Sequence, residues 1–277
     1  MTNATVTWLK SGGRRIDHGD SYEDMISVGA GIKDSGVPRS EIFITTKVGD
    51  GGLGLGAKDI HTQFEYYLQQ TGTSYVDLLL IHWPTSGDNS STPVCQMRGA
   101  SYDATACRLD SWKALLAIMA AGKAKAVGVS NFNTAHLQEI IDAKLPLPSV
   151  NQCPYNPHLH SAQAELLAMC KKHDIIFNSY SPLGIPDFHK YLGQDFSLVD
   201  DPKLKPLAKK HGLSPAQILL AWQAGIGGMV STRRNTGGLC AQACALSLTQ
   251  TYHACVCVGA RARLSHSGTG RCSTRGR

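Results

Sequence analysis

The chain has 277 residues, of which 42% are hydrophobic and 17% charged, so it has the length and composition of one large globular domain or two small ones. It contains no run of eighteen apolar residues, and its start, MTNATVTWLKSGG, lacks the apolar segment of a signal peptide, so a cytoplasmic location without membrane association is expected. Of the net charge of +6, residues 235–277 carry five Arg and no acidic residue, and the +1 that remains on residues 1–234 gives no indication of nucleic-acid binding.

Residues 1–234 alternate between strand-like and helix-like segments. Short apolar, β-branched runs predict seven strands, at 14–17, 41–47, 76–82, 125–130, 149–152, 175–180 and 227–231. A helix-like segment opens the chain at about residues 6–10, and others lie at 23–33, 59–71, 108–121, 134–143, 161–173 and 214–224. Repeated βα units of this size are typical of a doubly wound sheet or of a (β/α)8 barrel.

Chemically capable residues follow nearly every predicted strand, and this distribution favours the barrel. Catalytic groups of a (β/α)8 barrel come from the carboxyl ends of many strands, whereas a doubly wound sheet concentrates them at one switch point. No GxGxxG motif follows an early strand, which gives little support to a Rossmann site. Because a helix precedes the first predicted strand, we expect a barrel that lacks its first strand and leaves the strands beside the gap with open edges.

Four residues at or just after the first three predicted strands form the candidate catalytic set. Asp17 and Tyr22 lie in RRIDHGDSYED, Lys47 closes EIFITTK, and His82 closes VDLLLIH. On neighbouring parallel strands these side chains converge, and together they suit protonation of a carbonyl oxygen. Taken singly, three of them have a structural alternative: Asp17 could cap a helix or pair with Arg14 or Arg15, Tyr22 could pack in the core, and His82 could be a hydrogen-bonded structural residue. Lys47 is more unusual, because a lysine is rarely buried without a partner.

The segments GGRRIDHGDSYED, IFITTKV and LLLIHWP resemble the aspartate–tyrosine, lysine and histidine motifs of the aldo-keto reductase family. GKAKAVGVSNF, VNQCPYNP, SYSPLG and LAKKHGLSPAQILLAWQ follow in the family's order, so that the resemblance spans residues 4–233. It implies NADPH-dependent reduction of a small aldehyde or ketone to the alcohol, with Tyr22 as the general acid and His82 orienting the carbonyl. Lys47, which Asp17 would hold in place, would lower the pKa of the Tyr22 phenol from its ordinary value of about 10.

The resemblance also assigns residues to the cofactor, NADPH. They are Ser130, Asn131 and Gln152 for the carboxamide, Tyr180 for stacking on the nicotinamide ring, Ser181, Leu183 and Gly184 for the pyrophosphate, and Arg233 for the 2′-phosphate. Plain turn and helix-cap chemistry remains the alternative explanation of the SNF and NQ segments. Trp83, beside His82, is expected to form an aromatic wall of the substrate site.

Residues 235–277 depart from the family's pattern. They contain five of the nine Cys, six Gly and five Arg, but no Lys, Asp, Glu, Phe, Ile or Pro. We therefore predict an aldo-keto reductase-like barrel at residues 1–234 and an atypical tail at 235–277 that lies outside the core. A tail unrelated to the barrel is favoured over one that binds nucleic acid or a metal.

Cys95 and Cys107 lie within a long, polar segment, 84–109, which is expected to form part of a lid or of the substrate-site rim. A disulfide between them is possible, although free thiols are more usual in a cytosolic protein. No Cys pair has zinc-ligand spacing supported by a second pair, so no metal site is expected. Two alternatives to an active, monomeric reductase stay open: an inactive nucleotide-binding or regulatory relative, and an unstable fragment whose barrel never closes.

Overall fold

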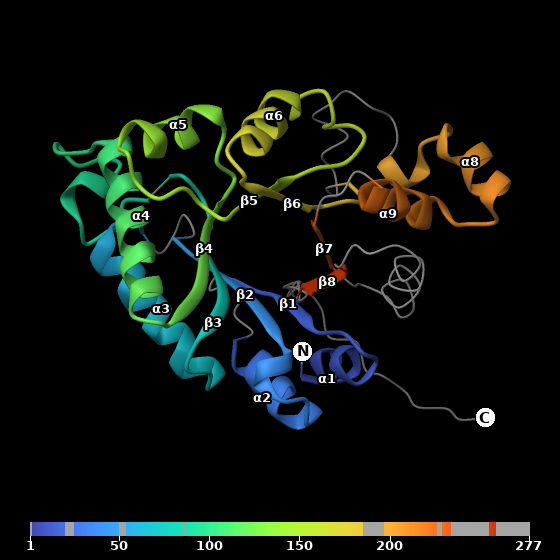
Figure 1. Ribbon diagram of the computed structural model, residues 1–277, viewed down its shortest axis with the longest axis horizontal. Helices are drawn as coiled ribbons and strands as arrows, with labels where there is room; N and C mark the ends of the chain where they lie inside the picture. The colour runs from blue at the N-terminus through green and yellow to red at the C-terminus, as the bar shows by residue number, and fades with distance from the viewer. Residues whose placement is uncertain are drawn as a thin grey trace, which may run out of the picture.

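The computed structural model describes residues 2–19, 25–49, 54–85, 87–184 and 197–225 in full, together with the backbone of residues 229–233 and 255–258. Within these residues, eight parallel strands form a closed barrel in chain order, with β8 paired to β1 (Figure 1). The strands are β1 (Arg15–Asp17), β2 (Phe43–Val48), β3 (Val76–Ile81), β4 (Ala124–Ser130), β5 (Val150–Pro154), β6 (Ile176–Tyr180), β7 (Met229–Arg233) and β8 (Cys255–Val258).

Helices surround the strands, with α3 and α4 along one flank and α8 and α9 beyond β6 and β7 (Figure 1). They are α1 (Thr2–Lys10), α2 (Met25–Ser35), α3 (Ala57–Thr71), α4 (Ala104–Ala120), α5 (Thr134–Asp142), α6 (Ala164–Lys172), α8 (Leu204–His211) and α9 (Pro215–Gly225), with short 3-10 helices at Arg39–Glu41, Pro93–Cys95 and Leu198–Asp200. None of the helices in the described part of the chain is long and apolar enough to cross a membrane.

The apolar side chains of strand β3 pack on both sides of the barrel wall, in the barrel interior and in the core between strands and helices. All six of its residues are buried. Leu78 and Leu80 contact Val150 in the barrel interior, whereas Leu79 and Ile81 belong to the core between strands and helices. Successive side chains of a strand point to opposite faces, so a strand covered on both faces must be apolar throughout.

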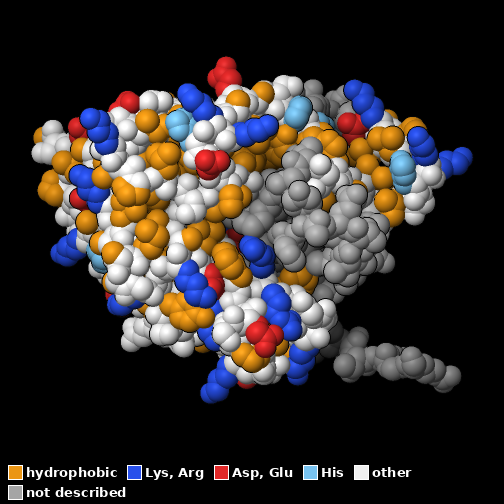
Figure 2. All heavy atoms as spheres, in the orientation of Figure 1, with side chains coloured by type: hydrophobic (Ala, Val, Ile, Leu, Met, Phe, Trp, Pro, Cys, Tyr) orange, Lys and Arg blue, Asp and Glu red, His pale blue; other side chains and the backbone are white. Residues whose placement is uncertain are grey.

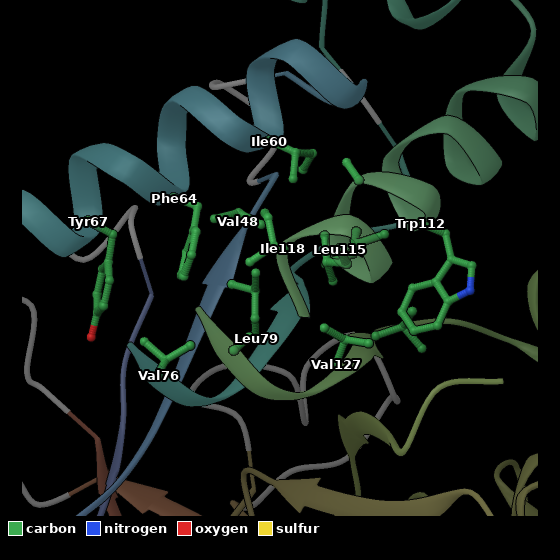
Figure 3. Close-up of a cluster of buried hydrophobic side chains, with 14 of the residues drawn as sticks. Val48, Ile60, Phe64, Tyr67, Val76, Leu79, Trp112, Leu115, Ile118 and Val127 are labelled. Carbon is green, nitrogen blue, oxygen red and sulfur yellow. The ribbon is translucent and has the colours of Figure 1, made fainter. Parts of the chain in front are cut away.

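The outer core fixes the strands against α3 and α4. In Figure 3, Phe64 of α3 and Leu115 and Ile118 of α4 point toward Leu79 and Val127 of the strands. Each of these five side chains is at most 2% exposed. Burying one such side chain contributes roughly 1.5–3 kcal/mol, so this layer gives the strand ends a rigid base.

Local sequence signals account for where two of the helices begin. Asn133 accepts a hydrogen bond from the backbone N–H of His136, whose ring in turn accepts one from the backbone N–H of Asn133, so the two residues form a capping box on α5. Helix α9 starts at Pro215, after Ser214 accepts from the backbone N–H of Gln217.

The predicted (β/α)8 barrel is confirmed, and each of the seven predicted strands is present, but the expected count was one short. Cys255–Val258, inside the predicted tail, forms β8 and pairs with both β7 and β1. The two strand edges that were expected to lie open are therefore paired. The division of the chain at Arg234 stays a prediction for the other residues of the tail.

On the face of the molecule shown in Figure 2, hydrophobic side chains lie in several small groups, and basic and acidic side chains are scattered among them. Large apolar side chains that are exposed include Ile26 of α2 and Tyr66 of α3. Isolated exposed apolar residues of this kind are ordinary on a protein surface.

Candidate active site

The carboxyl ends of six neighbouring strands bring polar side chains to one end of the barrel. Neighbouring parallel strands end on the same side, as the sequence analysis assumed. The residues are Asp17 of β1, Lys47 of β2, His82 directly after β3, Ser130 of β4, Gln152 of β5 and Tyr180 of β6.

Lys47 and Asp17 form a buried ion pair. The Lys47 ammonium donates to Oδ1 of Asp17 and, over 2.8 Å, to the carbonyl oxygen of His18. The Lys47 and Asp17 side chains are 2% and 1% exposed. A buried charge is tolerated only with such partners, so the predicted pairing of these two residues is confirmed.

Gln152 contacts the carboxylate oxygen of Asp17 that Lys47 does not use. Its Nε2 donates to Oδ2 of Asp17 over 2.6 Å. The Asp17 carboxylate therefore links a residue expected to contact the cofactor with the lysine expected to assist proton transfer. Sequence reasoning missed this contact, because the two residues lie 135 positions apart and no local spacing indicates it.

Asn131 connects the candidate cofactor residues with the histidine strand. Its Nδ2 donates to the carbonyl oxygen of His82 over 2.8 Å, and its Oδ1 accepts from the Tyr180 hydroxyl over 2.8 Å. The Ser130 hydroxyl donates to the carbonyl oxygen of Gln152 over 2.7 Å. These four predicted residues and His82 thus form one hydrogen-bonded network.

Two residues of this network region have unusual backbone conformations. Asn131 has a φ of 63° and Ser181 a φ of 54°, both in the left-handed region. Asparagine tolerates that region better than most residues, whereas a serine there carries strain, and such strain collects at functional sites. Lys144 and Asp174, in turns away from this site, adopt the same region, so the conformation alone assigns no role to the turns after β4 and β6.

The turn after β6 is fixed by polar and apolar contacts. Asn156 donates from Nδ2 to the carbonyl oxygen of Ser181 over 3.2 Å, and the Gly184 N–H donates to that same oxygen over 3.0 Å. Leu183 packs against a small cluster that includes Leu198. A Cβ on Gly184 would lie 3.1 Å from the Cβ of Leu198, and the φ of 88° at this position also favours glycine.

Ser130, Asn131 and Gln152 suit a planar amide by their chemistry. A carboxamide ligand offers both N–H donors and an oxygen acceptor, and amide and hydroxyl side chains can address either. Gln152 uses its NH2 group on Asp17, and its Oε1 accepts no hydrogen bond from the described residues. That oxygen is thus suited to accept from the amide of a ligand.

His82 and Trp83 follow β3 and differ in exposure. The His82 backbone N–H donates to the carbonyl oxygen of Val48 over 2.7 Å, and its side chain is buried. The Trp83 ring stacks against the His82 ring at an interplanar angle of 24°, with 6.0 Å between centroids, and Trp83 is 40% exposed. An exposed indole beside a buried imidazole fits the predicted aromatic wall.

The segment after Trp83 is more ordered than the sequence suggested. Residues 93–95 form a 3-10 helix, α4 already begins at Ala104, and Cys95 is bonded to Cys107 by a disulfide. Asp59 of α3 also accepts from the backbone N–H of Ser91 over 2.7 Å. The possible disulfide is therefore present in the structure, and the segment is fastened to both α3 and α4.

Arg108, a buried residue of α4, holds the start of the segment after Trp83 in place. Its guanidinium donates to the carbonyl oxygen of Pro84 over 3.2 Å and to both carboxylate oxygens of Glu139 in α5. Burial opposes ionisation of Glu139, but hydrogen bonds from Arg108 and Thr105 outweigh it and lower the pKa of the carboxyl. Sequence reasoning missed Arg108, although an arginine on the inner face of an apolar helix could have indicated a buried partner.

Two predicted site residues cannot be placed. Tyr22 lies outside the described residues, between β1 and α2 in the chain. Arg233 ends β7, and only its backbone is described. The proton-donor and 2′-phosphate assignments therefore stay predictions.

Comparison with known proteins gives consistent matches. The sequence profile of the Aldo/keto reductase family matches residues 2–236. An aldo-keto reductase of Mycolicibacterium vanbaalenii is 33% identical over 228 residues, which cover 82% of this chain and 71% of the relative. An aldehyde reductase of Saccharomyces cerevisiae is 34% identical over 231 residues, which cover 79% of this chain and 70% of the relative.

Solved structures agree with this result. The crystal structure of an aldo/keto reductase from Brucella melitensis matches with a TM-score of 0.69 and 31% identity, covering 89% of this chain and 79% of the other. That of a Bombyx mori aldo-keto reductase in complex with NADP matches with a TM-score of 0.71 and 28% identity, covering 91% of this chain and 78% of the other.

Proposed function

Because this chain belongs to the aldo-keto reductase family of NAD(P)H-dependent oxidoreductases, we propose that it reduces an aldehyde or ketone to the alcohol, with NADPH as cofactor and Tyr22 as the general acid. The observation that carries the proposal is the buried Lys47–Asp17 pair. Lysine is rarely buried without a partner, and the carboxyl ends of barrel strands are where this fold places its catalytic groups, so a buried lysine paired there supports a catalytic role.

In the proposed reaction, Tyr22 donates the proton that the carbonyl oxygen takes up on reduction. Lys47 stabilises the phenolate that remains, and Asp17 keeps the ammonium in position. His82 donates a hydrogen bond that orients the carbonyl. Oxidation of the alcohol follows the same path in reverse, with Tyr22 as the base.

The cofactor supplies the hydride when it is bound. Ser130, Asn131 and Gln152 hydrogen-bond its carboxamide, and Tyr180 covers one face of the nicotinamide ring. Ser181, Leu183 and Gly184 contact the pyrophosphate, and Arg233 donates to the 2′-phosphate, for which the arginine fork is well suited. The relative from Bombyx mori, solved in complex with NADP, supports this choice of cofactor.

The substrate is a small carbonyl compound bound beside Trp83. The exposed indole next to His82 supports an aromatic wall at this position. The segment after Trp83, fastened by the Cys95–Cys107 disulfide, then forms part of the rim. A cytoplasmic location and a monomeric state remain predictions.

The test is replacement of Tyr22 by phenylalanine. Removing the hydroxyl removes the proton donor, so turnover of a simple aldehyde should fall at least 100-fold, while the NADPH dissociation constant from fluorescence titration should change less than threefold. Tyr66→Phe, at an exposed position of α3, is the matched control and should keep full activity.

Undiminished turnover by the Tyr22→Phe chain would refute the mechanism. NADPH binding by the unaltered chain without turnover of any carbonyl compound would favour an inactive nucleotide-binding relative. Absence of NADPH binding by that chain would refute the proposal as a whole.

A further inference from the structure

Gln223 of α9 is a fully buried polar residue with both ends of its side chain engaged. It is 0% exposed. Its Oε1 accepts from the Ser179 hydroxyl over 2.7 Å, and its Nε2 donates to the carbonyl oxygen of Tyr155. Gln223 therefore ties an outer helix to the ends of two barrel strands, β5 and β6.

The sequence explains why Tyr155 needs this donor. The backbone N–H of Tyr155 donates to the carbonyl oxygen of Tyr180, which continues the parallel β5–β6 ladder one residue beyond β5. In a regular parallel ladder the Tyr155 carbonyl would next accept from the N–H of residue 182. That residue is Pro182, which has no N–H. The Gln223 side chain supplies the missing donor.

Tyr180 directly follows Ser179 and is hydrogen-bonded to the backbone of Tyr155, so it adjoins both of the residues that Gln223 contacts. Ser179 directs its hydroxyl to α9, and because strand side chains alternate, Tyr180 faces the other way. There its own hydroxyl reaches Asn131. Tyr180 is thus fixed through the residue before it, through Tyr155 across the ladder, and through Asn131 at its tip.

We propose that Gln223 is a positioning residue, which sets the place of the Tyr180 ring and so the affinity of the chain for the nicotinamide end of the cofactor. This inference rests on the proposed function. A glutamine suits this position because its amide accepts from the Ser179 hydroxyl and donates to the Tyr155 carbonyl at the same time, which a carboxylate or an apolar side chain cannot do.

The decisive variant is Gln223→Met, which keeps the size of the side chain and removes both hydrogen bonds. Helix α9 stays docked through buried Leu219 and Leu220 and through Trp222, whose ring stacks on Tyr155 at 5.5 Å. Two ligands are titrated: NADPH, by fluorescence, and adenosine 2′,5′-bisphosphate, which lacks the nicotinamide, by calorimetry. We expect NADPH to bind about tenfold more weakly, and the bisphosphate to keep its affinity within twofold.

Gln217→Met is the matched control, because Gln217 lies on the same helix and contacts Ser214 at its start. It should leave both affinities unchanged. Ser179→Ala removes one of the two hydrogen bonds without altering α9, and should weaken NADPH binding in the same selective way but by less. This variant also tests the inference if the Gln223→Met chain fails to fold.

The inference is overturned if the Gln223→Met chain binds NADPH as the unaltered chain does, or if both ligands lose affinity equally, since that would indicate a general structural defect. A failure of the unaltered chain to bind NADPH would instead refute the proposed function.

Discussion

The Lys47 ammonium donates to one carboxylate oxygen of Asp17, and the other oxygen of that carboxylate accepts from Gln152. Each charge in this pair is compensated by an opposite charge and by further hydrogen bonds, which is the condition for burying it. Any change that removes one partner leaves the other buried without its counter-charge. The same pair that serves proton transfer in the proposed mechanism is therefore a sensitive point of stability.

Replacing Lys47 by methionine should lower the free energy of unfolding by about 3–5 kcal/mol, because the Asp17 carboxylate is then buried without its cation. The double variant Lys47→Met/Asp17→Asn should recover most of that loss, since an asparagine oxygen can still accept from Gln152. Both variants should lack carbonyl reduction. Urea denaturation measures the stabilities.

Lys125→Met is the control for this prediction. Lys125 also pairs with a buried aspartate, Asp77, but its own side chain is 57% exposed, so its loss should change stability far less. A double variant no more stable than Lys47→Met would show that the buried carboxylate is not the source of the loss.

Asp17, Lys47 and His82 could be predicted from the sequence because each closes or follows a short apolar run, and parallel strands place such positions together. The link from Gln152 to Asp17 could not, because it crosses the barrel interior and depends on how the strands curve. The role of Gln223 could be recognised only once Pro182 was seen to leave a ladder position without a donor.

The elements themselves follow the pattern of the sequence closely. Each of the seven apolar runs became a strand, because burial on both faces leaves a short, continuous apolar run, and its length and β-branched residues distinguish it from a buried helix. Helix α4 begins at Ala104, four residues before the predicted start at 108. The reason is that its N-cap, Asp103, lies in a polar segment that was interpreted as a loop. The disulfide to Cys107, in the first turn of α4, joins that segment to the helix.

Helix α5 provides a pH-dependent test, because its capping box contains a histidine. His136 must be unprotonated at Nδ1 to accept from Asn133. Burial, followed by the positive charge of Arg108, lowers the pKa of His136, although Glu139 partly opposes this. The unfolded chain therefore binds a proton more readily, and the stability contributed by His136 is present above its ordinary pKa of 6.5 and lost as the pH falls below it.

His136→Gln should flatten this dependence. Glutamine can close the same capping box without titrating, so stability at pH 7.5 should change by less than about 1 kcal/mol. Between pH 7.5 and pH 5 the urea midpoint of the variant should fall less than that of the unaltered chain. Gln138→Ala, on the exposed face of the same helix, should retain the full pH dependence. Parallel pH profiles for all three chains would contradict the prediction.

At the scale of the whole molecule, closure of the barrel depends on the four residues of β8, which lie more than twenty positions after β7 in the sequence. The backbone of β8 pairs with Val230 to Arg233 of β7 and with Ile16 and Asp17 of β1. Val258 is paired in register with both Asp17 and Arg233, so β8 lies between the residue proposed to hold the Lys47 ammonium and the residue proposed to bind the 2′-phosphate. Sequence reasoning missed this strand, because CVCV is short and its surroundings lack a core pattern.

Ending the chain at Arg234 should therefore open the barrel between β7 and β1. The freed edges would expose unpaired backbone groups, which promote aggregation, and the strand ends that carry Asp17 and Arg233 would lose their common support. We expect the shortened chain to unfold at lower urea concentration and to bind NADPH at least tenfold more weakly, whereas a chain ending at Gly259, which retains β8, should behave as the full chain does. If the chain ending at Arg234 binds NADPH with undiminished affinity, residues 235–277 lie functionally outside the core, and the division of the chain at Arg234 holds after all.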